Sequence, residues 1–585
     1  MSSTGTIHGG SVNTKSVGGG NRFDRKDWFL FAALLVIALL LFLPYLGAAG
    51  MFDPTDSFFI ESGREMFETN KMIVPLMNYE PWLDKPALAF WFIVQSYRTF
   101  GVNEFAGRFP SALSGILLVL TTFVLTRQIL SRRQAFLAAL TLAASPLFLI
   151  VGHVALTDEP LALFLTVSLL SIANFIIQKR QVFLFLGYLA LALAALCKGP
   201  LALVIIGLIT VGYFLLTAPK KIVASILSLN PLLAIALLLF VTVPYYVWAH
   251  IGTNGEFTNA FFLRQNLGRM VGVVNHVNPF WWYIPVVIGG FFPWSLCAVG
   301  AGPFLLKFFK KRGNLMTARQ QLVFFSICWA LIGFLFFSAI PTKLQTYVVP
   351  IFPALAIVTG AYMDELLRLK RTKPFIVSAT GLLILSAGAA FLVHYLSTDS
   401  GFMTSLGYAT SVLLIVGLTA MIFVGRKQSC LSLSTVYGAT LLGCGIFLPL
   451  LFCLYHDKYQ ANVDSVVRYS QKNKAHLAAV QFEYPSIIYR YQEKIPLLKN
   501  QEDLQAYSDE PGKRWIFIPE EVLSLLSWTK RSPRVVGYCG KYWIFAIGKD
   551  ALKEGTIEWN GLLPQYHYPT IAELNAKTKS DALVH

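Results

Sequence analysis

The sequence predicts an α-helical membrane protein that crosses the bilayer many times and ends in a small α/β domain. Of its 585 residues, 55% are hydrophobic and 14% are charged, whereas about a quarter of the residues of a soluble protein carry charge. The apolar residues lie in runs of about 20, the length that crosses a hydrocarbon layer about 30 Å thick. The net charge of +17 comes from short basic clusters between these runs, a pattern typical of cytoplasmic loops. These observations exclude a soluble enzyme, a disordered chain and a nucleic-acid-binding protein.

The apolar runs predict the membrane spans. We expect about thirteen, at 28–49, 109–127, 134–153, 159–177, 182–197, 201–217, 222–249, 280–305, 321–340, 346–363, 375–396, 405–425 and 433–455. Residues 1–27 then form an N-terminal tail, residues 28–456 a transmembrane domain and residues 457–585 a C-terminal domain.

The basic clusters predict the orientation. They occupy every second connection, at Arg127/Arg132/Arg133, Lys179/Arg180, Lys220/Lys221, Lys307/Lys310/Lys311/Arg312/Arg319, Arg368/Lys370/Arg371/Lys373 and Arg426/Lys427. Short loops rich in Lys and Arg stay in the cytoplasm. The N-terminus is therefore expected inside and, after an odd number of spans, the C-terminal domain outside. Loops 50–108 and 250–279 face the same outer side.

The sequence of the C-terminal segment predicts an α/β domain. Apolar stretches at 477–482, 515–518, 535–538 and 542–546 predict strands, and helical patterns lie around 459–473, 500–507 and 519–529. No nucleophile elbow or metal motif occurs in it. The domain either covers a site on the outer face, helps to dock a substrate there, or is a purely structural lid.

Carboxylates crowd the first outer loop. Sixteen of the 31 acidic residues precede residue 457, and eight of those sixteen lie between Asp53 and Glu104. Asp53 and Asp56 directly follow the first span, where desolvation raises the pKa of a carboxyl and suits it to accept a proton. The alternative for Asp56 is capping of a helix that begins at Ser57. For the acids further along that helix we favour a solvated face.

Other candidates on the outer side are cations and one more acid. Lys85 in Asp84-Lys-Pro86 either binds a phosphate or extends to the headgroup level. Asp158, followed by Glu159 and Pro160, is a functional candidate because acids at the membrane boundary are rare, although helix capping competes. Further charged or polar residues on this face are Arg64, Arg108, Lys198, Arg264, Arg269, His276, Lys343 and Tyr347.

Cofactor signals are absent from the sequence patterns. The seven cysteines show no zinc or disulfide spacing, and no nucleotide-binding fingerprint occurs. We therefore predict no resident metal, while participation of a divalent cation stays open. An activated donor on the outer face would arrive on a lipid carrier.

Six short motifs resemble one family. They are Phe52-Asp-Pro-Thr-Asp56, Arg64-Glu-Met66, Asp84-Lys-Pro86, Thr157-Asp-Glu-Pro160, Lys198-Gly-Pro200 and Lys343 through Tyr347. In this order they resemble the bacterial polyprenyl-phosphate-sugar glycosyltransferases related to protein O-mannosyltransferases and to the aminoarabinose transferase of lipid A. The resemblance covers residues 28–456 strongly and the C-terminal segment weakly.

The resemblance implies the fold, the reaction and the site. It implies an inverting enzyme of the membrane-embedded C-type glycosyltransferase fold, with about thirteen helices and a periplasmic domain, in a bacterial inner membrane. The donor is a sugar on undecaprenyl phosphate and the acceptor is one such as lipid A. The catalytic positions map onto Asp56 and Asp158, and those near the carrier phosphate onto Lys85, Arg269, Lys343 and Tyr347.

This chain departs from the family pattern at two places. Thr55 occupies the usual catalytic aspartate position, and Phe58-Phe59 replaces an Arg-Tyr pair of the aminoarabinose enzymes. Asp56 or Asp53 substitutes for the missing acid, the sugar differs, or the enzyme is impaired; we favour Asp56. The alternatives to transfer onto lipid A are transfer onto a protein or another glycolipid, a lipid-linked-sugar flippase and a non-catalytic assembly partner.

Overall fold

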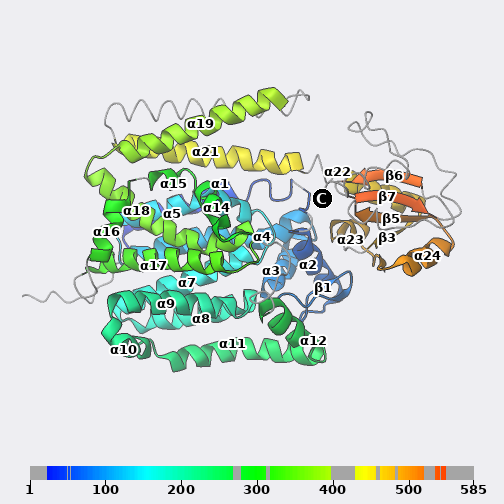
Figure 1. Cartoon of the computed structure of the whole chain (residues 1–585), viewed down its shortest axis with the longest axis horizontal. Coiled ribbons are helices and arrows are strands. Elements are labelled where there is room, and N and C mark those ends of the chain that lie inside the picture. The colour runs from blue at the N-terminus through cyan, green and yellow to red at the C-terminus, as the bar shows by residue number, and fades with distance from the viewer. Residues whose placement is uncertain are drawn as a thin grey trace, which may run out of the picture.

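The chain forms a helical bundle with a small sheet domain at one end (Figure 1). This computed structural model describes residues 23–48, 50–52, 55–267, 278–298, 300–310, 316–396, 429–455, 461–480, 485–519, 534–539 and 542–547. Within these ranges the helices of the bundle are α1 (Arg25–Phe42), α4 (Glu104–Arg127), α5 (Arg132–Ala143), α6 (Pro146–Gly152), α7 (Asp158–Gln178), α8 (Gln181–Lys198), α9 (Leu201–Thr217), α10 (Ile222–Leu227), α11 (Pro231–Gly252), α14 (Tyr283–Gly290), α15 (Trp294–Cys297), α16 (Gly302–Lys310), α17 (Ala318–Ala339), α18 (Phe352–Arg368), α19 (Lys373–Leu396) and α21 (Ser429–Tyr455). Short η1 (Pro219–Lys221), η2 (Asn259–Leu267), η3 (Phe280–Trp282), η5 (Gln345–Ile351) and α12 (Glu256–Thr258) connect them.

Several of these helices are long and apolar enough to cross a membrane. Among the described residues there are six, in α4, α7, α8, α11, α17 and the segment Gln345–Arg368, or up to eight if the bent pairs α5–α6 and α9–α10 each count as one span. A helical, multi-pass membrane protein is thus confirmed. The predicted span 405–425 lies outside the described ranges.

Several predicted spans are interrupted, among them 134–153, which bends between α5 and α6. The run 222–249 divides into α10 and α11, because Asn230 caps α11 and Pro231 occupies its first turn, where a missing N–H is harmless. The run 280–305 divides into α14, α15 and α16, with Pro293 before α15 and Gly300 in a left-handed conformation before α16. Apolar composition alone does not reveal these breaks.

The bundle is held together by close helix contacts. Gly360 on α18 lies so near α5 that a Cβ atom built there would come within 2.6 Å of the backbone nitrogen of Ala138. Small residues permit this approach, and dispersion contacts between backbones stabilise helix pairs in lipid. Substitution of Gly360 by a larger residue would separate α5 from α18.

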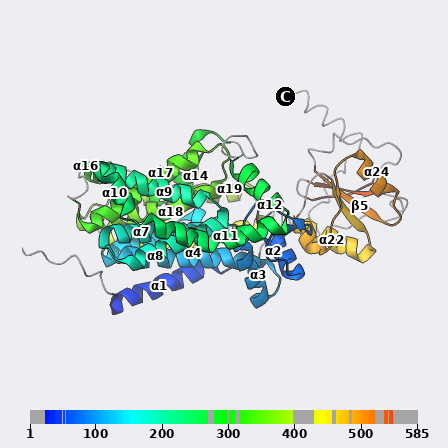
Figure 2. The same ribbon diagram turned by 90° about the horizontal axis from the view of Figure 1, so that it is seen from below.

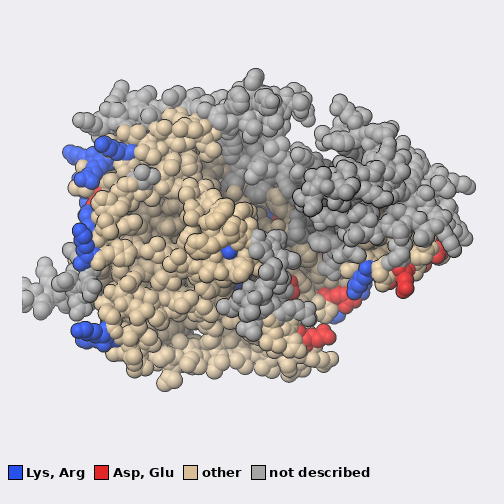
Figure 3. All heavy atoms as spheres, viewed as in Figure 1, with Lys and Arg blue, Asp and Glu red and all other residues tan. Residues whose placement is uncertain are grey.

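Charge divides the two ends of the bundle. Lys and Arg gather at the end formed by α10, α16 and the end of α18 (Figure 3). Exposed members of this group are Lys220, Lys221, Lys307, Lys310, Arg368, Lys370 and Arg371. The sheet domain and the first loop lie at the opposite end in both ribbon views (Figures 1 and 2).

The first loop forms a helix, a hairpin and a second helix. The predicted helix is α2 (Ser57–Thr69), which is followed by the two-stranded hairpin β1 (Leu76–Met77) and β2 (Glu80–Pro81) and by α3 (Leu88–Phe100). Asn78 and Tyr79 form the two-residue turn with φ of 54° and 62°. Asn tolerates this left-handed conformation better than most residues, which suits it to the turn.

The C-terminal segment folds around a five-stranded sheet of order β4-β3-β5-β7-β6. Its elements are α22 (Ala461–Asn473), β3 (His476–Val480), α23 (Pro485–Tyr491), β4 (Leu497–Leu498), α24 (Gln501–Asp509), β5 (Arg514–Pro519), β6 (Arg534–Cys539) and β7 (Tyr542–Ile547). β3 pairs in parallel with β4 and β5, and β7 pairs antiparallel with β5 and β6. Side chains alternate between two apolar clusters, with Leu477 and Phe517 on one face and Ala478 and Ile516 on the other, as a strand period of two requires. The helix predicted at 519–529 falls on residues that, apart from Pro519 in β5, are not described.

Candidate active site

Asp56 is fixed by an arginine from the next part of the chain. Its Oδ2 atom lies 2.7 Å from Nε of Arg108 in α4, and its Oδ1 accepts a hydrogen bond of 2.5 Å from the backbone N–H of Phe52. The Arg108 guanidinium also donates to the carbonyls of Leu46 and Gly50 at 2.8 and 2.6 Å. The two side chains are 0% and 1% exposed. The pair therefore joins the end of the first span, the start of α2 and the start of α4.

The capping alternative for Asp56 is wrong in one respect. Asp56 does occupy the position before α2, but its side chain makes no capping hydrogen bond. The carboxylate turns to Arg108 instead, because a charged partner stabilises a buried carboxylate more strongly than a neutral N–H does.

Asp158 lies in a second cluster built from three segments. Nζ of Lys198, the last residue of α8, donates to Oδ1 of Asp158, the first residue of α7, at 2.5 Å. The same Nζ lies 4.1 Å from the ring centroid of Tyr347 in η5. Asp158 is the first residue of α7 and therefore does not occupy the N-cap position. Thr157 does, and its side chain makes no capping hydrogen bond. Sequence reasoning named all three residues but gave no reason to group them.

The ammonium of Lys198 retains hydrogen-bonding capacity. An ammonium has three donors, and within the described ranges only the bond to Asp158 is made. The second oxygen of Asp158 likewise accepts no hydrogen bond from a described residue. This cluster can therefore receive an anionic or hydroxyl-bearing ligand without first breaking an internal contact.

Lys343 is occupied by the backbone. Its Nζ donates to the carbonyls of Ile340 and Asn278 at 2.6 and 2.9 Å and more weakly to that of Pro341 at 3.5 Å. Asn278 returns a side-chain hydrogen bond of 3.1 Å to the carbonyl of Lys343. Lys343, 3% exposed, thus joins the end of the second loop to the turn before η5.

Lys85 lies in the connection between the hairpin and α3. It is half-buried, and two residues later the backbone N–H of Ala87 donates to the Tyr245 hydroxyl on α11 at 3.0 Å. This contact attaches the segment that carries Lys85 to α11.

The Asp56 and Asp158 clusters lie on neighbouring elements. Ser111, one turn after Arg108 on α4, exchanges hydrogen bonds with the backbone N–H and carbonyl of Leu156 at 3.3 and 3.4 Å. Leu156 is two residues before Asp158. Both carboxylates are therefore at the end of the bundle that faces the sheet domain.

The acids of α2 do not form a solvated face, and that prediction is wrong. Arg64 is fully buried and its Nε and Nη2 atoms lie 2.7 and 2.5 Å from the two carboxylate oxygens of Glu61. Its Nη1 lies 2.5 Å from Glu68, which is the one exposed acid of the group at 39%. Glu65 is also buried and accepts a 2.7 Å hydrogen bond from the backbone N–H of Tyr79. Burial, followed by the nearby charge of Glu61, raises the pKa of Glu65 to about 9.

The sequence indicates Arg108 as a cation of the outer side and Glu159 as an acid beside Asp158, but it assigns neither of them a partner. Glu159 is fully buried and neither of its oxygens has a partner among the described residues. Arg108 directly precedes the apolar run 109–127, which is the signal that identifies it. The sequence could not say which opposite charge would meet it.

Three predicted site residues cannot be placed. Asp53, Arg269 and His276 fall outside the described ranges. Within those ranges, no group of three or more His, Cys, Asp or Glu residues is arranged to hold a metal ion.

Several known proteins are similar to this chain. Residues 84–248 match the model of the dolichyl-phosphate-mannose-protein mannosyltransferase family. An undecaprenyl phosphate-α-4-amino-4-deoxy-L-arabinose arabinosyl transferase of Pectobacterium carotovorum is 28% identical over 436 residues, which cover 72% of this chain and 74% of the relative. A second transferase of that description, from Proteus mirabilis, is 30% identical over 338 residues, 56% of this chain and 59% of the relative. An uncharacterised protein of Aquifex aeolicus is 28% identical over 336 residues, so that the match spans only 64% of that relative.

A solved structure shares the fold. The crystal structure of ArnT from Cupriavidus metallidurans bound to undecaprenyl phosphate superimposes with a TM-score of 0.73 at 21% identity, covering 89% of this chain and 98% of that one. The fold therefore defines a helical, multi-pass membrane protein with the architecture of ArnT. These matches confirm the predicted resemblance to the polyprenyl-phosphate-sugar glycosyltransferases.

Proposed function

We propose that this chain transfers a sugar from a polyprenyl phosphate carrier to an acceptor at the outer face of a bacterial inner membrane, with inversion at the anomeric carbon. The observation that carries the proposal is the Asp158–Lys198–Tyr347 cluster, which offers both a carboxylate oxygen and ammonium donors at one end of the bundle. Relatives named for transfer of 4-amino-4-deoxy-L-arabinose from undecaprenyl phosphate support it. We propose lipid A as the acceptor, with that pentose or another sugar as the group transferred.

The proposed topology follows the charge. The Lys- and Arg-rich end of the bundle (Figure 3) belongs in the cytoplasm with residues 1–27. The site and the C-terminal domain, residues 457–585, then face the periplasm, and about thirteen spans lie within residues 28–456. This orientation requires that the donor reach the site on a lipid that has already crossed the bilayer.

The reaction breaks the bond between the anomeric carbon and the carrier phosphate. An acceptor oxygen attacks that carbon, and the electron pair leaves with the carrier as polyprenyl phosphate. Because negative charge grows on the leaving phosphate, nearby cations stabilise the transition state. We assign this role to the cations Lys198, Lys85 and Arg269, with the Tyr347 ring beside the Lys198 ammonium. Lys343 can join them only after it releases its backbone carbonyls.

The two carboxylates receive different proposed roles. We assign to Asp158 the role of orienting or deprotonating the acceptor, because one of its oxygens accepts no hydrogen bond from the described residues. Asp56 substitutes for the aspartate that Thr55 replaces, and it acts while paired with Arg108. If the acceptor is a phosphate, already a good nucleophile, positioning by both carboxylates suffices.

Release of the carrier tests the proposal. Purified protein in vesicles is incubated with a radiolabelled polyprenyl-phosphate sugar and lipid A, and free polyprenyl phosphate is measured. The proposal predicts release by the wild type and strong loss in Asp56→Asn, Asp158→Asn and Lys85→Ala. A flippase would move the labelled lipid without releasing free carrier, and full activity in all three variants would refute the residue assignment.

A further inference from the structure

The C-terminal domain and the first loop exchange side chains. Met77 of the hairpin lies in the apolar cluster of the sheet domain, and Tyr489 of α23 lies in the core cluster of the bundle; they are 2% and 5% exposed. Phe58 and Trp82, with ring centroids 5.3 Å apart, pack against both clusters. A lid that rested loosely on the bundle would not bury side chains in both directions.

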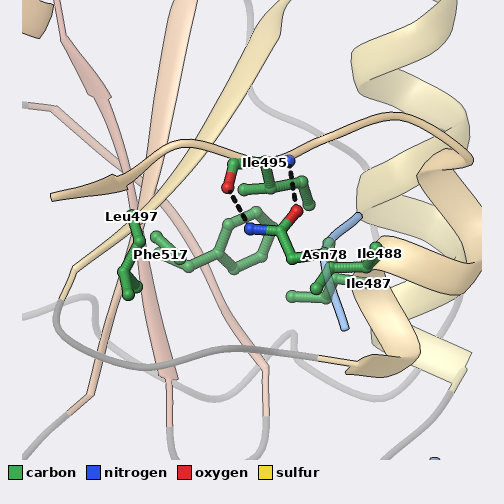
Figure 4. A pocket seen from close by; sticks show the side chains of 7 residues that line it. Asn78, Ile487, Ile488, Ile495, Leu497 and Phe517 are labelled. Carbon is green, nitrogen blue, oxygen red and sulfur yellow. Dashed lines mark hydrogen bonds between the residues drawn. The ribbon is translucent and has the colours of Figure 1, made fainter. Parts of the chain in front are cut away.

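Side chains of the hairpin turn form hydrogen bonds with backbone groups of the C-terminal domain. Nδ2 of Asn78 donates to the carbonyl of Ile495 at 2.8 Å, and the N–H of Ile495 donates to Oδ1 of Asn78 at 2.9 Å (Figure 4). Beside this pair is a small apolar cavity with room for about one water molecule. The next residue, Tyr79, donates from its hydroxyl to the carbonyl of Gln492 at 3.2 Å. Its hydroxyl also lies 3.4 Å from both terminal nitrogens of Arg64. The contact thus extends into the buried network of α2.

An arginine bridges the domain to the start of α4. Arg490 of α23 pairs with Glu104, the first residue of α4, and its Nε lies 2.8 Å from Asp464 of α22. Glu104 is one helical turn before Arg108, the partner of Asp56. In addition, α23 packs against α2, the helix that begins directly after Asp56. The domain therefore contacts both elements that enclose the Asp56–Arg108 pair.

We propose that the C-terminal domain is a positioning part of the active site, and that Arg490 and Asn78 hold α2 and the start of α4 around the Asp56–Arg108 pair. This inference rests on the proposed function and adds two positioning residues to it. Neither residue needs to contact a substrate. Displacements of about 1 Å at a reacting group reduce rates by up to about 100-fold, so loss of the docking contacts is expected to slow transfer.

The experiment uses the full chain in vesicles and four substitutions. Arg490→Ala removes the bridge to Glu104. Asn78→Asp keeps the size and the acceptor of Asn78 but removes the donor and sets a carboxylate oxygen against the Ile495 carbonyl. Arg490→Lys retains the positive charge and should therefore keep part of the docking contact that Arg490→Ala loses. Lys494→Ala is the matched control, because the pair of Lys494 with Glu80 is 56% and 65% exposed and such pairs contribute little.

Two readouts are needed for every variant. Hydrogen exchange at residues 57–69 reports on α2, and release of polyprenyl phosphate gives kcat and the KM for the donor. Arg490→Ala and Asn78→Asp should increase exchange in α2 and lower kcat about tenfold, with the donor KM changed less than about twofold. Arg490→Lys should be intermediate, and Lys494→Ala should match the wild type in both readouts.

The outcomes separate this inference from the proposed function. If exchange in α2 rises while kcat is unchanged, the docking contacts are structural only and the inference is wrong. If kcat falls without a change in exchange, the effect does not pass through α2 and the inference is also wrong. A wild type that releases no polyprenyl phosphate overturns the proposed function and this inference with it.

Discussion

Two carboxylate–cation pairs at the same end of the bundle differ in how many of their hydrogen-bond donors and acceptors are occupied. In the Asp56–Arg108 pair, both carboxylate oxygens accept hydrogen bonds and the guanidinium also holds two backbone carbonyls. In the Asp158–Lys198 pair, one oxygen and one ammonium donor meet each other, and the ammonium rests on the Tyr347 ring. The first pair connects three chain segments, whereas the second has capacity for a ligand. The remaining donors and acceptors of a buried ion pair thus decide whether it can bind a ligand without first losing an internal contact.

The largest expected effect is that of Arg108→Ala on stability. The substitution leaves the Asp56 carboxylate buried without its charged partner, which costs about 3–5 kcal/mol in comparable pairs. We expect a large fall in the melting temperature in detergent. Arg98→Ala, near the end of α3, is the control, since Arg98 is exposed. Equal melting temperatures for Arg108→Ala and wild type would show that the pair does not hold the loop.

Asp158→Asn should affect transfer more than folding. The amide keeps the size of the carboxylate but removes the charge beside Lys198, and we expect kcat to fall about 100-fold, as for removal of one preorganised group in other enzymes. The melting temperature should fall less than that of Arg108→Ala, because the amide oxygen of Asn can still accept a hydrogen bond from Lys198. Steady-state release of the carrier and a thermal melt on the same preparation measure both quantities. A stable variant with normal kcat would remove Asp158 from the site.

Lys343→Met distinguishes a structural role of this lysine from a role in binding the carrier phosphate. The structure predicts a structural role, because the Lys343 ammonium donates to three carbonyls that the Met side chain cannot satisfy. Leaving such groups unpaired costs about 1–3 kcal/mol each at most, so the melting temperature should fall. The donor KM should stay near the wild-type value. A stable variant with a raised donor KM would instead place Lys343 at the carrier phosphate, as the family resemblance implies.

Glu65 should make stability depend on pH. The pKa of this carboxyl is raised from 4.5 to about 9 in the folded chain. The folded state therefore holds a proton that the unfolded chain releases above about pH 4.5, and stability falls as the pH rises from there toward 9. Glu65→Gln removes the contribution of this carboxyl. The melting temperature of the variant should decline less between pH 5 and pH 8 than that of the wild type.

The control for this prediction is Glu68→Gln on the same helix. Glu68 is 39% exposed, so its neutralisation should leave the pH profile close to that of the wild type. Parallel profiles for Glu65→Gln and wild type would show that Glu65 is ionised in the folded protein.

Much of the architecture could be predicted from the sequence, and the missing part has a physical reason. Hydropathy predicts where long apolar helices lie, because every backbone group in lipid must be satisfied within its own segment. It does not predict the interruptions at Pro231 and Pro293, where capping and local turns decide the outcome. The strands of the C-terminal domain are visible as short apolar stretches, as Leu477 to Val480 illustrate.

The site was predictable in its members but not in its pairings. Asp56, Asp158, Lys198 and Lys343 were all recognisable as unusual charges on one side of the bundle. Their partners depend on contacts between distant segments, such as Arg108 with Asp56 and Tyr347 with Lys198. The same limit explains the error at α2, where Glu61 and Glu65 look solvated until the packing of α23 over the helix is known.

The donor KM of Lys198→Ala tests the central claim most directly. If the free donors of Lys198 bind the carrier phosphate, the variant should need at least about tenfold more polyprenyl-phosphate sugar for half-maximal release, equivalent to about 1.4 kcal/mol. The measurement is a titration of labelled donor against carrier release by equal amounts of folded wild type and variant. A donor KM unchanged from the wild type would contradict the claim that the Asp158–Lys198 pair receives the carrier.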